Sequence, residues 1–162
     1  MRYLIVCGGK TDKEFGLNEI KTDGIDAIIA ADSGMDFLYE NGVTPDIIVG
    51  DFDSATTKAL EFFERKGQTE IHRLNPIKDD TDTEYAIRLA IREGARSIVM
   101  LGATGSRIDH VLGNISLLGI GLESGTDISI IDTNNRIRMA DKPVTIEKSA
   151  QYGRFVSLIA VT

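Results

Sequence analysis

Short apolar runs alternate with segments of helical spacing along most of the chain, and this alternation carries the prediction of the fold. Each run is bounded by glycine or polar residues, which is typical of strands buried inside a parallel sheet. A final run ends at Ile131, and the earlier ones cover residues 3–6, 27–31, 47–49, 70–74 and 97–101. The resulting order of six strands and about four helices predicts an α/β protein with a mostly parallel, Rossmann-like sheet and helices on both faces.

Helix ends are indicated by capping residues at the expected places. A helix over 57–66 is predicted to begin after an N-cap at Ser54 and to end at Gly67. A later helix follows Thr81 and Glu84, which have the spacing of a capping box. Apolar residues then recur at i, i+3, i+4 and i+7 from residue 108, which predicts one more helix after the strand at 97–101.

The pattern changes after Asp132, where a turn signal introduces three short runs of strand character at 136–139, 144–147 and 155–161. We therefore expect an α/β domain over 1–132, followed over 133–162 by the start of a C-terminal all-β domain. The sequence stops before this second region is expected to close a core, so the β domain is predicted to be truncated.

Composition narrows the possible functions. The chain is 42% hydrophobic and 27% charged, as in ordinary globular proteins, and its net charge of -7 argues against binding to nucleic acid or anionic membranes through counterion release. Cys7 is the only cysteine, which excludes intrachain disulfides and cysteine-rich zinc sites. The apolar runs are too short for a signal-peptide core or a membrane span, so a cytoplasmic protein is expected.

Two aspartates, Asp51 and Asp53, follow the strand at 47–49 with one residue between them. If the chain stays extended there, their carboxylates point to the same side. Mg²⁺ is typically held by one or two such carboxylates together with the phosphates of a substrate. A metal site is the functional interpretation, and a solvated acidic loop before a capped helix is the structural alternative.

Polar loops also follow the other predicted strands, at 8–9, 32–34, 78–82 and 102–109. Ligands of open α/β sheets bind outside the carboxyl ends of the strands, so these loops are expected to meet along one edge. Arg107 can contact a phosphate bidentately, and the glycines before it allow close backbone approach. The acids at 79–82 and Asp109 also suit a helix N-terminus, which is their structural alternative.

Three motifs in this order and spacing resemble those of thiamine pyrophosphokinases: Gly-Asp-Phe-Asp-Ser at 50–54, Asp-Asp-Thr-Asp-Thr at 79–83, and Gly-Ser-Arg-Ile-Asp-His at 105–110. Asp-Ser-Gly at 32–34 is a fourth match, and the resemblance extends from residue 1 to about 135. It implies an α/β domain that binds ATP and Mg²⁺, a C-terminal β-sandwich domain, and a homodimer with active sites between subunits. The implied reaction transfers the terminal diphosphate of ATP to the hydroxyl of thiamine and releases AMP.

The resemblance also assigns roles by position. Its acidic site residues are Asp32, Asp51, Asp53, Asp82 and Asp109. Those expected to act in catalysis are Asp51, Asp53, Asp82 and Asp109, and the first three of these are expected to bind Mg²⁺. The residues expected beside the nucleotide are Asp32, Ser33, Lys78, Thr81, Gly105 and Arg107. The acceptor of the hydroxyl proton stays open between Asp82 and Asp109.

Two other functions compete with this interpretation. A haloacid-dehalogenase-like phosphatase also has an Asp-x-Asp loop after a strand, but Ala55 occupies the place where that motif usually has Thr or Val. A non-catalytic module that binds a nucleotide or thiamine is the second alternative, and it would bind both ligands without turnover. No nucleic acid or membrane partner is expected.

Overall fold

Seven strands form one sheet in the computed structural model, which describes residues 1–52, 55–75 and 80–161. Six of them are parallel: β1 (Arg2–Val6), β2 (Ala27–Ala31), β3 (Ile47–Gly50), β4 (Glu70–Arg73), β5 (Ser97–Leu101) and β6 (Asp127–Ile131). The seventh, β7 (Arg136–Arg138), pairs with β6 in the antiparallel sense. The predicted strands up to Ile131 are thus confirmed, and so is their parallel direction.

The strand order is β4-β3-β2-β1-β5-β6-β7. The chain starts in the middle of the sheet, moves outward from β1 to β4, and then returns to the other side of β1 with β5. The order therefore reverses between β1 and β5, and in open α/β sheets such a switch point opens a crevice at the carboxyl ends of the strands.

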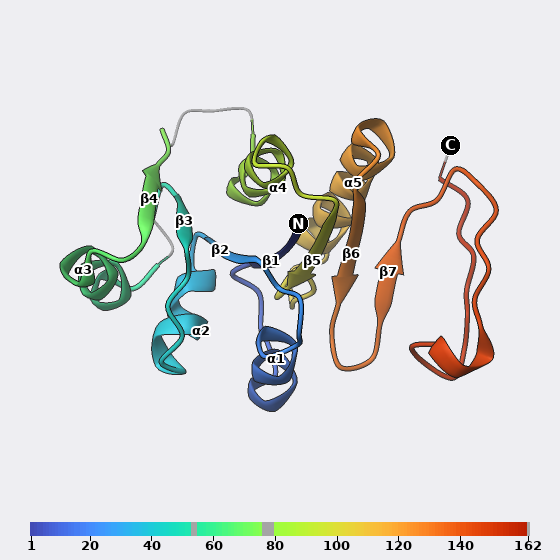
Figure 1. Ribbon diagram of the computed structural model, residues 1–162, viewed down its shortest axis with the longest axis horizontal. Coiled ribbons are helices and arrows are strands. Elements are labelled where there is room, and N and C mark those ends of the chain that lie inside the picture. The colour runs from blue at the N-terminus through green and yellow to red at the C-terminus, as the bar shows by residue number, and fades with distance from the viewer. Residues whose placement is uncertain (53–54, 76–79, 162) are drawn as a thin grey trace.

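Helices cover both faces of the sheet, as predicted (Figure 1). On one face lie α1 (Lys13–Ile20), α2 (Gly34–Glu40) and α3 (Thr57–Lys66), and on the other lie α4 (Asp82–Arg92) and α5 (Ile108–Ser124). Each layer buries its own apolar core, one around Met35, Leu38 and Phe63 and the other around Ile87 and Leu118. Within the described part of the chain, no helix is long and apolar enough to cross a membrane.

The predicted helix caps are only partly correct. The Thr81 hydroxyl accepts a hydrogen bond from the Glu84 N–H (3.1 Å), but the Glu84 carboxylate binds Arg88 (2.9 Å to Nε). Helix α3 has its N-cap at Thr56 and not at Ser54, which lies outside the described residues. The Asp36 carboxylate holds Thr56, because it accepts hydrogen bonds from both the Thr56 hydroxyl and the Thr56 N–H.

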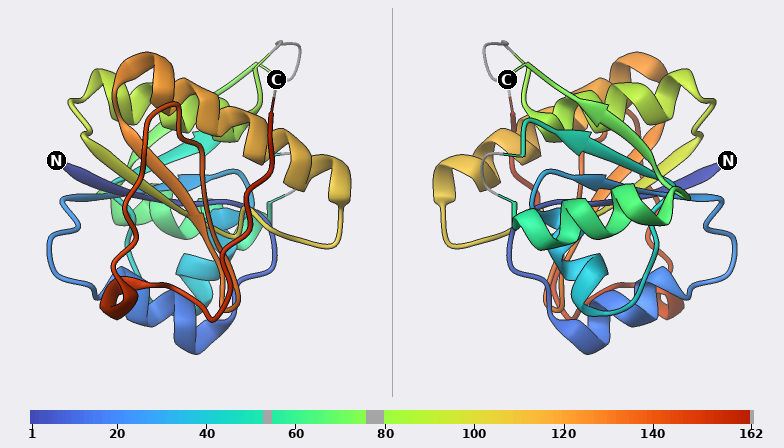
Figure 2. Two further views of the ribbon diagram at one scale, coloured as in Figure 1. Left: turned by 90° about the vertical axis from the view of Figure 1, so that its right-hand side faces the viewer. Right: turned by 90° about the vertical axis from the view of Figure 1, so that its left-hand side faces the viewer.

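The region after β6 differs from its prediction. Its first strand forms as β7 but joins the main sheet, and among the described residues neither 144–147 nor 155–161 is a strand. A strand needs a neighbour for its backbone groups, and these segments run beyond β7 (Figures 1 and 2). Their larger apolar side chains are exposed. Phe155 and Leu158, for example, are 83% and 95% exposed. A separate β domain over 133–162 stays a prediction.

Cys7 directly follows β1 and is buried, and burial raises the pKa of its thiol to about 12 from an ordinary value of 9.0. Between these values the unfolded chain loses a proton that the folded chain keeps. The free energy of unfolding should therefore fall as pH rises through this interval, by at most about 1.4 kcal/mol per pH unit. Urea unfolding at pH 7 and pH 10.5 measures this fall, which should be smaller in Cys7→Ala than in the wild type. An equal fall in the free energy of unfolding of both proteins would contradict the burial of the thiol.

Candidate active site

Three aspartates converge at the carboxyl edge of the sheet. Asp32 follows β2, Asp51 follows β3, and Asp82 is the first residue of α4. One carboxylate oxygen from each lies within 4.8 Å of the other two, and all three residues are half-buried. Segments far apart in the sequence thus deliver three hard oxygen ligands to one place, a donor set that suits Mg²⁺.

The backbone is unusual on both sides of this cluster. Asp32 has φ of 49° and Phe52 has φ of 66°, the two non-glycine residues with positive φ among those described. Such conformations cost roughly 1–3 kcal/mol each and concentrate at functional sites. The Asp32 N–H donates to the carbonyl of Val49 (2.8 Å), and the Phe52 ring packs in the core beneath the Arg73 guanidinium (5.4 Å). Tertiary contacts therefore hold both turns.

The positive φ of Phe52 corrects one prediction. The chain is not extended at Phe52, so the extended geometry assumed between Asp51 and Asp53 does not hold at the residue between them. Asp53 lies outside the described residues, and the neighbours that the structure gives Asp51 are Asp32 and Asp82.

Electrostatics make the cluster costly without a cation. Two carboxylate charges at this separation repel by roughly 3–4 kcal/mol at an effective dielectric of 20. The N-terminus of α4 offsets part of this cost at Asp82, because the helix dipole favours a negative charge in the first turn. A divalent cation would convert the repulsion into attraction, so the cluster can hold a metal ion against phosphate groups.

The loops that follow β1 and β5 lie against each other at the carboxyl edge of the sheet, where the strand order reverses. The Gly9 N–H donates to the Gly102 carbonyl (2.9 Å), and Asn114 of α5 donates to the Ala103 carbonyl (2.8 Å). Gly105 faces Gly9, with 3.7 Å from its would-be Cβ to the Gly9 Cα. Ser33, after β2, lies against Gly8. Of the expected nucleotide contacts, Ser33 and Gly105 therefore both lie against the glycines that follow β1.

Arg107 and Asp109 form an ion pair at the start of α5 (2.5 Å), with both side chains more than 60% exposed. The hydrogen bond from Arg107 lowers the pKa of the Asp109 carboxyl below its usual range. A lower pKa means a weaker base, so the ion pair with Arg107 makes the Asp109 carboxylate a poorer proton acceptor in this arrangement. Asp109 does not belong to the cluster of Asp32, Asp51 and Asp82.

The remaining predicted residues divide into two groups. Thr81 is the exposed N-cap of α4, so it sits next to Asp82, and its hydroxyl is engaged by the helix. Lys78 and Asp53 lie outside the described residues, as does Asp79.

Sequence reasoning missed Asp132, which joins the site loops to the turn between β6 and β7. Its carboxylate accepts hydrogen bonds from the Thr104 hydroxyl (2.9 Å) and from the backbone N–H groups of Asn134 (2.7 Å) and Asn135 (2.8 Å). Aspartate two or three residues before asparagines is a signal for such a turn. The partner in Thr104 could not be found from local sequence, because 28 residues separate the two.

The Asp132 contacts predict an acid-sensitive stability. Burial alone would raise the pKa of this carboxyl, but the hydrogen bonds from Asn134, Asn135 and Thr104 lower it overall. The stabilisation is present at neutral pH and lost as pH falls through the lowered pKa. Asp132→Asn should cost roughly 1–3 kcal/mol in urea unfolding at pH 7 and less at pH 3. The exposed control Asp141→Asn should change little; an equal cost for Asp132→Asn at both pH values would contradict this account.

The fold and the site together define a doubly wound α/β protein with a carboxylate cluster at the carboxyl edge of its sheet. Residues 21–130 match the family model described as thiamin pyrophosphokinase, catalytic domain. The chain therefore belongs to the thiamine pyrophosphokinase family, which confirms the resemblance seen in its motifs.

Individual relatives agree with this placement. Thiamine pyrophosphokinase of Bacillus subtilis (strain 168) is 37% identical over 111 residues, which are 68% of this chain and 51% of that protein. The crystal structure of thiamine pyrophosphokinase from Bacillus subtilis matches with a TM-score of 0.73 at 32% identity, over 85% of this chain and 64% of that one. The crystal structure of a probable thiamine pyrophosphokinase from Staphylococcus saprophyticus matches with a TM-score of 0.66 at 33% identity, over 85% of this chain and 68% of that one. The chain thus spans about half the length of this curated relative.

Proposed function

We propose that this protein is a thiamine pyrophosphokinase, which transfers the diphosphate of ATP to thiamine and yields thiamine diphosphate and AMP. The convergence of Asp32, Asp51 and Asp82 carries the proposal, because all three lie within the residues matched by the catalytic-domain model. Neither the phosphatase alternative nor the non-catalytic module is favoured by the similar proteins.

The proposed reaction has a simple balance of bonds. The hydroxyl oxygen of thiamine attacks the β-phosphorus of ATP and forms a new O–P bond. The bond from the β-phosphorus to the α–β bridging oxygen breaks, its electron pair leaves with AMP, and the hydroxyl proton is released. Such a transfer needs little covalent help from protein, so positioning and charge neutralisation dominate.

Mg²⁺ fits the donor set, and Asp32, Asp51 and Asp82 would hold it, with Asp53 as a further proposed ligand. When bound, the ion would neutralise charge on the phosphates and hold them in place. Arg107 and Lys78 are the proposed counter-charges for the outer phosphate oxygens. Ser33, Thr81 and Gly105 are proposed to line the nucleotide site around them. Asp82 and Asp109 both stay candidates for the proton acceptor, because Asp82 is also a proposed Mg²⁺ ligand and Arg107 lowers the pKa of Asp109.

The rest of the enzyme follows from the family as a proposal. A C-terminal β domain would complete the thiamine pocket, and two copies of the protein would form a homodimer in the cytoplasm. Exposed apolar side chains at Phe155, Leu158 and Ile159 support this extension, because they would gain a covering surface from it.

An assay of AMP release by the full-length protein tests the proposal. With ATP and Mg²⁺ present, AMP should form only after thiamine is added, and EDTA should abolish the reaction. Binding of both ATP and thiamine without any turnover would instead support the non-catalytic module.

A further inference from the structure

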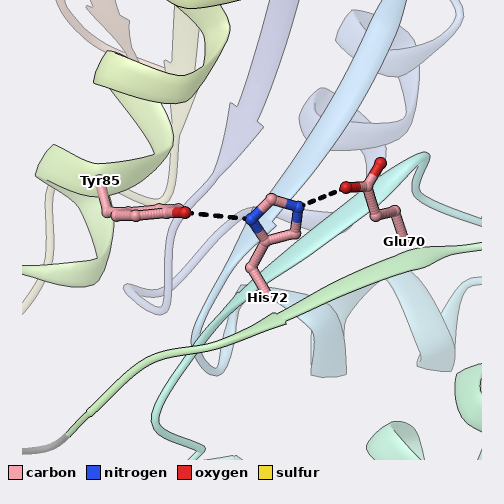
Figure 3. Close-up of polar contacts among 3 residues, drawn as sticks. All are labelled: Glu70, His72 and Tyr85. Carbon is pink, nitrogen blue, oxygen red and sulfur yellow. Dashed lines mark hydrogen bonds and ion pairs between the residues drawn. The ribbon is translucent and has the colours of Figure 1, made fainter.

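Three side chains link the edge strand β4 to helix α4, on the face of the sheet that α4 and α5 cover (Figure 3). His72 of β4 lies between them: its Nε2 is 2.6 Å from Glu70 Oε1, and its Nδ1 is 3.1 Å from the Tyr85 hydroxyl. The His72 and Tyr85 rings also meet edge to face, with centroids 5.9 Å apart. Glu70 precedes His72 by two residues on β4, whereas Tyr85 comes from a different element and is brought to His72 only by the fold.

The donor and acceptor roles follow from the chemistry of the three groups. An ionised Glu70 can only accept, so His72 Nε2–H donates to it, and the neutral ring then accepts the Tyr85 O–H at Nδ1. A protonated ring would donate from both nitrogens, and the Tyr85 oxygen would accept. Both contacts therefore persist in either protonation state, and the link acts as a mechanical connection between β4 and α4.

The position of Tyr85 connects this link to the acidic cluster. Tyr85 lies three residues after Asp82, so both occupy the same face of α4, together with the buried Ala86 and Leu89. Thr83 ties the same first turn to the end of β1 through the Cys7 sulfur (3.8 Å). The first turn of α4 is thus fixed toward the sheet centre by Thr83 and toward the sheet edge by Tyr85.

We infer that Glu70, His72 and Tyr85 position Asp82 within the metal site, as residues that act on the site without touching the ligand. This inference rests on the proposed function of the acidic cluster. Asp82 is the one cluster member carried by a helix, whereas Asp32 and Asp51 directly follow strands of the sheet. Its distance from the other two therefore depends on how α4 is set against the sheet. The helix packs on β1, β2 and β3, and the Tyr85–His72 bond adds a tie to β4 near Asp82.

Substitution of Tyr85 by Phe removes the hydroxyl and keeps the ring, including its contact with Arg92 (5.5 Å from the ring centroid to Arg92 Cζ). Mn²⁺ accepts the same oxygen ligands as Mg²⁺, and its binding to the full-length protein can be followed directly by electron paramagnetic resonance. We expect Tyr85→Phe to raise the Kd for Mn²⁺ roughly threefold to tenfold, the effect of one lost hydrogen bond on ligand placement. The matched control is Tyr39→Phe on α2, whose ring packs on Phe62 and Phe63, and it should leave the Kd unchanged.

A double-mutant cycle separates positioning from general loss of stability. His72→Phe and Tyr85→Phe each remove the same hydrogen bond, so the double variant should bind Mn²⁺ about as weakly as the weaker single variant. Lower resistance to urea with an unchanged Kd, or two effects that multiply, would overturn the inference. Wild-type protein that binds no Mn²⁺ would overturn the proposed metal site and the inference with it, whereas normal binding by both wild type and Tyr85→Phe would overturn the inference alone.

Discussion

Replacement of Asp51 and Asp82 together by asparagine is expected to lower kcat/KM for diphosphate transfer by at least about a thousandfold, because two of three clustered carboxylates would lose their charge. Binding of Mn²⁺ to the free protein should be lost in the same variant. The free energy of unfolding in EDTA should change little, since the relief of repulsion among the carboxylates offsets the lost helix-dipole interaction of Asp82. Kinetics, metal titration and urea unfolding on one preparation measure all three.

A charge-matched control makes this result specific. Asp23 and Asp141 are exposed and lie outside the cluster, so Asp23→Asn with Asp141→Asn changes the net charge equally. This control should keep activity and metal binding close to wild type. Normal turnover by the variant of Asp51 and Asp82 would refute the role of the cluster, and an equal loss in the control would point to net charge as the cause.

Gly102→Ala is expected to cause a large loss of stability in the site loops. Gly102 has φ of +64°, and a Cβ there would lie 2.4 Å from the carbonyl oxygen of Cys7 and 2.9 Å from that of Gly9. Both atoms belong to backbone at the junction of β1 and β5, where neither loop can retreat without breaking the Gly9–Gly102 hydrogen bond. The substitution should cost roughly 3–5 kcal/mol in urea unfolding, from backbone strain and overpacking together.

Gly125→Ala is the matched control, because Gly125 has a similar φ of +73° and a Cβ there would meet nothing within 4 Å. The free energy of unfolding of this variant should fall only by the cost of placing alanine in the left-handed conformation, about 1–2 kcal/mol. The difference between the two variants therefore isolates the close packing of the β1 and β5 loops. Equal losses would show that these loops move apart more easily than the structure implies.

The sheet was predictable because parallel strands buried on both faces leave continuous apolar runs, such as Ile5 and its neighbours in β1. Helix α1 was not predicted, since only Gly16 of its residues is fully buried and it lacks a broad apolar stripe. The strands expected at 144–147 and 155–161 had the right composition, but a strand also requires a pairing neighbour, which composition cannot supply.

The acidic site was predictable in its location and only partly in its geometry. Asp51 directly follows β3 and Asp82 begins α4, and both positions lie at the carboxyl edge of the sheet. Ligands of open α/β sheets bind at this edge, so the location could be predicted from the order of the elements alone. Phe52 has a positive φ and its ring packs against the core, so a local extended geometry was the wrong assumption at this residue. The links from Tyr85 to His72 and from Thr104 to Asp132 likewise join separate elements that only the fold brings together.

In the proposed reaction, this site moves the β- and γ-phosphates of ATP as one unit onto thiamine. Phosphorus NMR of the full-length protein with ATP, Mg²⁺ and thiamine tests it most directly, because each product has its own resonances. We expect AMP and thiamine diphosphate in equal amounts from the wild type, and neither product from the variant of Asp51 and Asp82. Formation of ADP with thiamine monophosphate would contradict the claim.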